Sequence, residues 1–88
     1  METNRWTVVI RTIPVIAKEN EYLDYDREQK KTHEHLSLKE VIGFVNHFAD
    51  RYPDADFYSD NGLSGTGMTY NEGPEGVYHD LEILKEDS

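Results

Sequence analysis

The segment 37–52, SLKEVIGFVNHFADRY, restricts the possible folds of this chain more than any other stretch. Ser37 can cap a helix, and Glu40 three residues later completes a capping box, in which each side chain accepts a hydrogen bond from a backbone N–H group. Pro53 ends the helix, because a proline disfavours helical geometry in the residue before it. The sequence therefore predicts one helix that begins after Ser37 and ends at Tyr52.

Apolar residues recur at helical spacing within this segment and define a single stripe. The stripe contains Leu38, Val41, Ile42, Val45, Phe48, Ala49 and Tyr52. Leu36, which precedes the cap, and Val41 are also placed to form a hydrophobic staple. A helix with one apolar stripe needs a second layer to cover it, so we expect the flanking segments to supply a sheet.

Residues 5–13, RWTVVIRTI, predict a strand because they are rich in β-branched and aromatic side chains. Alternation places Trp6, Val8 and Ile10 on one face and Thr7, Val9, Arg11 and Ile13 on the other. Since both faces carry apolar residues, we expect this strand to lie inside the sheet rather than at its edge. Pro14 cannot donate a ladder hydrogen bond and indicates a bulge or the end of the strand.

Residues 22–35 leave the choice between strand and loop open. Residues 18–21 are polar and predict a hairpin turn. Residues 22–28, YLDYDRE, alternate in a way that fits a partly exposed strand paired with the first one. A short helix over residues 28–31 is the alternative, although no cap residue begins it. Residues 29–35, QKKTHEH, indicate a solvated loop or the end of a strand.

The part of the chain after the helix predicts three further strands. Residues 54–60, DADFYSD, fit a short strand with Ala55 and Phe57 inward. Residues 61–67, NGLSGTG, predict a loop, and residues 67–70 and 77–84 predict the two arms of a hairpin. The second arm alternates most clearly: Val77, His79, Leu81 and Ile83 face one way, and Tyr78, Asp80 and Glu82 face the other.

These elements predict an α+β fold. One main amphipathic helix packs on a four- to five-stranded, mostly antiparallel sheet, in the order β-β-α-β-β-β. At 88 residues the chain is long enough for one small domain, with flexible ends expected at 1–4 and 85–88. There is no cysteine, which excludes a disulfide scaffold, a thiolate zinc site and a cysteine nucleophile. Arg11 and Pro14 interrupt the apolar run near the N-terminus, so we expect no signal peptide and a cytoplasmic location, the host cytoplasm for a phage-encoded protein.

Charge is distributed unevenly along the chain. The net charge is −9, from 18 acidic and nine basic residues. Residues 1–51 contain nine acidic and eight basic residues, whereas residues 52–88 contain nine acidic residues and one base, Lys85. An acidic surface repels phosphate and attracts a basic partner. We therefore expect a protein partner with a basic surface, and no direct binding to nucleic acid or to a membrane.

No motif predicts catalysis, a metal site or a cofactor. Gly62, Gly65 and Gly67 lack the Gly-Lys-Ser/Thr ending and the following helix of a phosphate loop. Asp54, Asp56 and Asp60 do not match the calcium-loop spacing. His33 and His35 would share one face of a strand and could hold a metal with a third ligand such as Glu34 or His79. Solvated histidines are the simpler interpretation, and we expect no cofactor.

Acidic and aromatic residues alternate in the second half of the chain, and they form our candidate partner-binding set. The set is Asp54, Asp56, Tyr58, Asp60, Tyr70, Glu72, Glu75, Tyr78, Asp80 and Glu82. Residues two apart on a strand are separated by about 6.6 Å. Asp54 with Asp56, and Asp80 with Glu82, would therefore form short rows of negative charge with about the rise of two DNA phosphates. Interleaved tyrosines suit a protein interface.

In size, acidity and lack of catalytic motifs, the chain resembles small phage-encoded inhibitors of nucleic-acid enzymes, which include DNA mimics and anti-CRISPR proteins. The resemblance implies a non-enzymatic protein that blocks a basic nucleic-acid-binding site on a host protein. One alternative is a small self-associating or scaffold domain that forms homodimers through exposed strand edges. A second is a metal-dependent or hydrolytic enzyme that uses His33 and His35 or a carboxylate pair.

Overall fold

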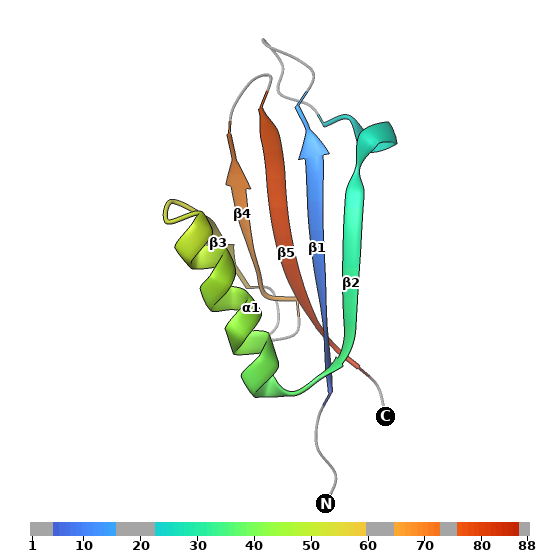
Figure 1. Cartoon of the computed structure of the whole chain (residues 1–88), viewed down its shortest axis with the longest axis vertical. Coiled ribbons are helices and arrows are strands. Elements are labelled where there is room, and N and C mark those ends of the chain that lie inside the picture. Colours follow the sequence, from blue (N-terminus) through green and yellow to red (C-terminus); the bar gives the residue numbers. More distant parts are fainter. Residues whose placement is uncertain (1–4, 16–22, 60–64, 73–75, 87–88) are drawn as a thin grey trace, which may run out of the picture.

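The computed structural model describes residues 5–15, 23–59, 65–72 and 76–86, and shows an α+β fold with one helix and a five-stranded antiparallel sheet (Figure 1). The elements in chain order are β1 (Trp6–Pro14), the 3-10 helix η1 (Tyr25–Arg27), β2 (Gln29–Leu36), α1 (Leu38–Arg51), β3 (Asp56–Tyr58), β4 (Gly67–Asn71) and β5 (Val77–Lys85). The strands lie in the order β2-β1-β5-β4-β3 across the sheet. The predicted fold class is confirmed.

Strand β1 lies inside the sheet, as its two apolar faces predict. It pairs with β2 on one side and, over its full length, with β5 on the other. The even-numbered residues of β1 face α1, and the odd-numbered residues face away from it. The nine-residue pairing of β1 with β5 joins the two ends of the chain, because Trp6 lies opposite Lys85. Lys85, expected in a flexible tail, is the last residue of this strand.

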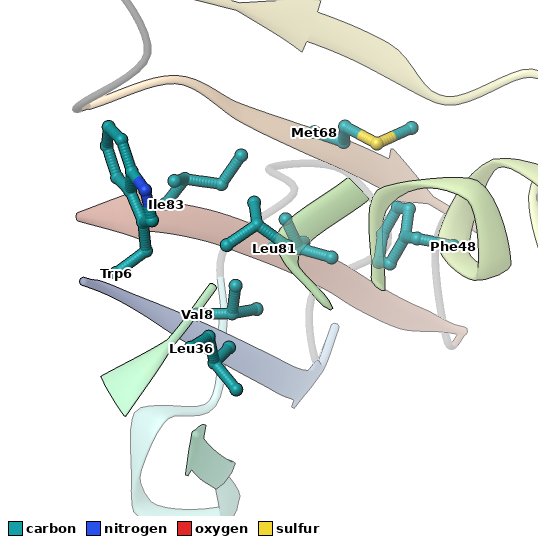
Figure 2. Packing of buried hydrophobic residues seen from close by; sticks show 8 residues of the cluster. Trp6, Val8, Leu36, Phe48, Met68, Leu81 and Ile83 are labelled. Carbon is teal, nitrogen blue, oxygen red and sulfur yellow. The ribbon is translucent and has the colours of Figure 1, made fainter. Parts of the chain in front are cut away.

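The hydrophobic core lies between α1 and the face of the sheet that carries Trp6 and Val8. Figure 2 shows how its side chains converge from β1, β2, β4, β5 and the helix. The cluster consists of Trp6, Val8, Leu36, Val41, Phe48, Met68, Leu81 and Ile83. Full burial of such a side chain stabilises the fold by about 1.5–3 kcal/mol, so these contacts are what holds α1 on the sheet.

The helix begins where the sequence predicts and ends one residue before the predicted end. The Ser37 Oγ atom accepts a hydrogen bond from the Glu40 backbone N–H at 3.2 Å, and the Glu40 Oε1 atom accepts one from the Ser37 N–H at 2.9 Å. Both halves of the capping box are therefore formed. Leu36 and Val41, the predicted staple pair, are both buried. Helix α1 ends at Arg51, with Tyr52 as its C-cap.

The apolar stripe of α1 is shifted relative to the prediction. Leu38 and Ile42 are 48% and 51% exposed, while Phe44, outside the predicted stripe, packs against the core. The sheet beneath Leu38 and Ile42 ends in β3, which is only three residues long. This edge of the helix therefore extends past the surface that would cover it.

The second strand is placed differently from the prediction. Residues 25–27 form η1, and β2 begins at Gln29, in the segment that the sequence assigned to a loop or strand end. Of the earlier alternation, Leu23 forms only an isolated bridge with Val15. Only Leu36 is buried in β2. Strand β2 lies at the edge of the sheet and is stabilised by backbone pairing with β1. Its side chains can therefore be polar, so the sequence lacks the apolar alternation by which strands are recognised.

The last three strands agree with the prediction except that β3 is shorter than the predicted strand 54–60 and that Phe57 is exposed. Strands β4 and β5 form the predicted hairpin, and His79, Leu81 and Ile83 are buried on the helix side. Phe57 lies opposite Met68 and so on the same side of the sheet, but it is 66% exposed because α1 does not reach over it. The predicted turn at 18–21 lies outside the described residues, and so does most of the predicted glycine loop.

Candidate functional site

The face of the sheet opposite α1 carries a shallow depression of about 350 Å³. We call this the open-face depression; it is lined by Arg11, Ile13, Leu23, Tyr25, Glu28, Tyr58, Tyr78, Asp80 and Glu82. Three of these side chains are acidic, three are tyrosines and one is a base. When all three carboxylates are ionised, the depression therefore has an excess of two negative charges over its one guanidinium group.

Arg11 lies at the centre of the depression, because it is directly opposite Asp80 in the pairing of β1 with β5. Its Nη1 atom lies 2.8 Å from Asp80 Oδ2, and its Nη2 atom lies 3.5 Å from Glu82 Oε1. Its Nε atom lies 3.4 Å from Glu28 Oε2. Burial lowers the pKa of Arg11, but the three neighbouring carboxylates more than offset this and raise it overall. One guanidinium group thus holds three carboxylates together.

Asp80 is the buried member of this group, with 6% of the residue exposed. Burial raises its pKa, and the neighbouring Arg11 only partly opposes that change. Tyr58 donates a hydrogen bond from its hydroxyl group to Asp80 Oδ1 at 3.3 Å. Burial and the charge of Asp80 together raise the pKa of Tyr58, so its hydroxyl group stays a donor.

Gly67 allows Tyr58 to reach across β4 to Asp80. In the register of the sheet, Tyr58 lies opposite Gly67, and Gly67 lies opposite Glu82. A Cβ atom at position 67 would collide with the Tyr58 ring and with the backbone carbonyl oxygen of Leu81. An aromatic ring that covers a glycine on the neighbouring strand is a known way to fix the register of a sheet. Gly67 is therefore required for the close approach of the ring.

The structure divides the predicted partner-binding residues between the two faces of the sheet. Tyr58, Tyr78, Asp80 and Glu82 line the open-face depression, and Asp56 lies on the same face, separated from Asp80 by Thr69. Tyr70 stacks on Tyr52 on the helix side, and Glu72 binds His79 there. Asp54 is exposed in the turn before β3. Asp60 and Glu75 lie outside the described residues.

Of the two predicted rows of negative charge, Asp80 with Glu82 is formed and Asp54 with Asp56 is not. Asp80 and Glu82 do share a face, but Asp80 is buried and both interact with Arg11. Asp54 lies before β3 rather than in it, so it does not form a strand row with Asp56. Sequence reasoning missed Arg11, Glu28 and Tyr25. An arginine on a central strand signals a nearby carboxylate, but the pattern does not identify which one.

The side chains of His33 and His35 contact different parts of the structure. The strand β2 has an extra residue between Leu36 and His33 relative to Trp6 and Val8 of β1, and His35 has a φ of 61° at this bulge. The His33 ring lies 4.6 Å from the Phe44 ring, whereas His35 Nδ1 lies 2.9 Å from Glu86 Oε1. Within the described ranges, no three His, Asp or Glu side chains come together as a metal site.

No helix in the described part of the chain is long and apolar enough to cross a membrane. Comparisons of the chain with protein-family models, with curated proteins and with solved structures found no match.

Proposed function

We propose that this protein is a small non-enzymatic inhibitor, of the DNA-mimic or anti-CRISPR type, that covers a basic nucleic-acid-binding site on another protein. The observation that carries the proposal is the open-face depression, where three carboxylates share one guanidinium group beside three tyrosines. The acidic second half of the chain adds a long-range attraction for a basic partner.

The depression can bind a cationic side chain without losing its own ion pair. Asp80 keeps Arg11 at 2.8 Å, while Glu28 and Glu82 lie farther from Arg11, at 3.4 and 3.5 Å, and are partly exposed. An arginine or lysine of a partner can therefore bind Glu28 and Glu82 from the solvent side. Each such charge-assisted hydrogen bond contributes about 1.5–3 kcal/mol.

Tyr25 is the aromatic side chain best placed to contact a partner. It belongs to η1, lines the depression and is largely exposed. Tyrosine and arginine are the residue types that most often dominate binding energy at protein interfaces. A guanidinium group that enters between Tyr25 and Glu28 would combine an ion pair with stacking on the ring.

The experiment compares two doubly substituted proteins with the same change in charge. In the first, Glu28→Gln and Glu82→Gln remove both partly exposed carboxylates of the depression. In the second, Glu34→Gln and Asp50→Asn remove two exposed carboxylates elsewhere. Each protein is used to capture partners from lysate at increasing salt, followed by mass spectrometry and a competition assay with nucleic acid. We expect the wild type and the second variant to capture a basic protein and to displace its nucleic acid.

The first variant is expected to lose that capture, and salt is expected to weaken the capture by the other two steeply. If the first variant captures the same protein as the second, the depression is not the binding site. Capture that ignores salt, or a captured protein that keeps its nucleic acid, would contradict the inhibitor proposal.

A second candidate function is self-association. The groove of about 240 Å³ between α1 and β3 has an entirely apolar surface and includes the exposed side chains Leu38, Ile42 and Phe57. The strand edges themselves discourage pairing, since β3 is short and β2 carries lysines and a bulge. A homodimer would therefore use the groove. A mass that rises with concentration for the wild type, but not for Ile42→Lys, would support it.

A further inference from the structure

A second groove lies on the helix side of the sheet, and its lining is opposite in charge to the open-face depression. It occupies about 390 Å³, within the range of small-molecule sites, and its walls are α1 and β2, which flank β1 and β5 in Figure 1. Its lining contains Lys31, His33, His47, Arg51 and His79, and none of the described residues that line it is acidic. In a chain with a net charge of −9, this is an unusual concentration of basic side chains.

The basic side chains come from both walls, with Lys31 and Arg51 as the charged ones. Lys31 and His33 lie opposite Ile10 and Val8 of β1, which places them on the helix side. His47 and Arg51 are one turn apart on α1 and are both exposed. Neither Lys31 nor His47 forms an ion pair with another described residue. An anion in the groove could therefore bind Lys31 on β2 and His47 on α1 without displacing an acidic side chain.

A hydrogen-bonded network links four residues at one end of the groove. Arg51 Nε donates to the Tyr52 hydroxyl oxygen at 3.2 Å, and that hydroxyl lies 3.2 Å from His79 Nδ1. His79 Nε2 lies 2.8 Å from Glu72 Oε2, and the hydrogen bond from His79 lowers the pKa of Glu72. Because the ionised Glu72 can only accept, Nε2 donates to it, and in the neutral ring Nδ1 is then the acceptor for the Tyr52 hydroxyl group. The Arg51 guanidinium group lies over the Tyr52 ring, 5.7 Å from its centroid, and its charge contributes to the lowered pKa of Glu72.

Aromatic rings pack together at this network. The Tyr52 and His79 rings stack with their centroids 4.3 Å apart, and Tyr70 stacks on the other rings. Phe44 lines the groove beside them. We infer that the groove between α1 and β2 binds a small organic anion with a planar ring, of which a nucleoside monophosphate is the simplest example. The ring would lie against Phe44 and Tyr52, and the anionic group between Lys31 and Arg51. This site is separate from the proposed partner-binding face.

The test uses AMP as the probe, with adenosine and inorganic phosphate as its two halves, and follows the binding by NMR. We expect saturable shifts of the His33 and His47 ring signals with AMP, and weaker binding of either half. Lys31→Gln is expected to weaken the binding of AMP about tenfold or more, as expected for the loss of one charged hydrogen bond. Lys30→Gln is the matched control, because Lys30 lies opposite Arg11 and faces the other side of the sheet.

Three outcomes would overturn the inference. The first is an absence of saturable shifts with AMP in the wild type. The second is adenosine that binds as tightly as AMP, since the anion would then contribute nothing. The third is an equal loss of AMP binding in the Lys30 and Lys31 variants, which would indicate that AMP is attracted to any surface lysine rather than bound in the groove. Thermal unfolding of both variants checks that they fold; an unfolded Lys31→Gln protein would be replaced by Arg51→Gln, with the same expected loss.

Discussion

The guanidinium group of Arg11 lies 2.8 Å from the carboxylate of Asp80, on the face of the sheet opposite α1. The two residues are 69 positions apart in the chain, and the pairing of β1 with β5 places them directly opposite each other. Although the pair is close, burial still raises the pKa of Asp80. The desolvation of this carboxylate is therefore larger than the stabilisation that Arg11 provides for its charged form.

Removal of Arg11 alone is expected to destabilise the fold strongly. Arg11→Met leaves Asp80 buried without a countercharge, and the loss of one partner from such a pair costs about 3 kcal/mol or more. The free energy of unfolding from urea titration at neutral pH measures this. Arg27→Met, in the exposed η1, is the control and should change stability by less than about 0.5 kcal/mol. The double variant Arg11→Met/Asp80→Leu should recover most of the loss; equal losses for the single and double variants would contradict the prediction.

The pKa of Asp80 also predicts a pH dependence of stability. A raised pKa means that the folded protein holds the proton more tightly than the unfolded chain does. The stabilisation that this pKa difference gives to the folded protein is therefore fully present below the pKa of Asp80 in the unfolded chain, about 3.9. It is lost as the pH rises through the pKa of Asp80 in the folded protein. Glu72 and Glu86 have lowered pKa values and act in the opposite direction. Their effect cancels when the wild type is compared with Asp80→Asn.

We expect the stability of the wild type relative to Asp80→Asn to decrease as the pH rises from acidic to neutral. Denaturant titrations of both proteins across that range measure the difference. A difference that grows with rising pH would show that the ion pair with Arg11 outweighs the burial of Asp80.

The elements with strong local signals were predictable from the sequence. The capping box at Ser37 and the proline after Tyr52 bound the helix without reference to any other segment. The alternation along β5 likewise assigned Asp80 and Glu82 to one face. Strand β2 was left undecided between strand and loop, because it is held by backbone pairing with β1 and its own side chains are polar and mostly exposed.

The candidate site was only partly predictable for a related reason. Alternation along a strand shows which residues share a face, but it does not show which residues of another strand lie opposite them. The pairing of β1 with β5 turns a predicted row of acidic side chains into a cluster around Arg11. The same limit applies to Phe57, whose side of the sheet was predictable but whose exposure depends on where α1 ends above it.

The contact of Tyr58 with Gly67 predicts a large effect for a small substitution. Gly67→Ala adds a methyl group that collides with the Tyr58 ring and with the Leu81 carbonyl oxygen. Overpacking of this kind costs about 1–3 kcal/mol. Gly43→Ala is the control, because a Cβ atom there meets nothing within 4 Å and alanine favours a helix. Thermal unfolding should place the Gly67 variant below the wild type and the Gly43 variant at or above it.

The backbone conformation at His35 predicts that a glycine at this position is more stable than an alanine. Its φ of 61° lies in the left-handed region, which costs a residue with a side chain about 1–2 kcal/mol. His35→Gly and His35→Ala both remove the side-chain contact with Glu86 and keep the backbone N–H bond to it. We therefore expect the glycine variant to be more stable by about 1 kcal/mol. At Thr32, in the regular part of β2, glycine should instead be less stable than alanine by about 0.5–1 kcal/mol. Urea titration of the four variants measures both differences, and alanine above glycine at both positions would rule out the left-handed bulge.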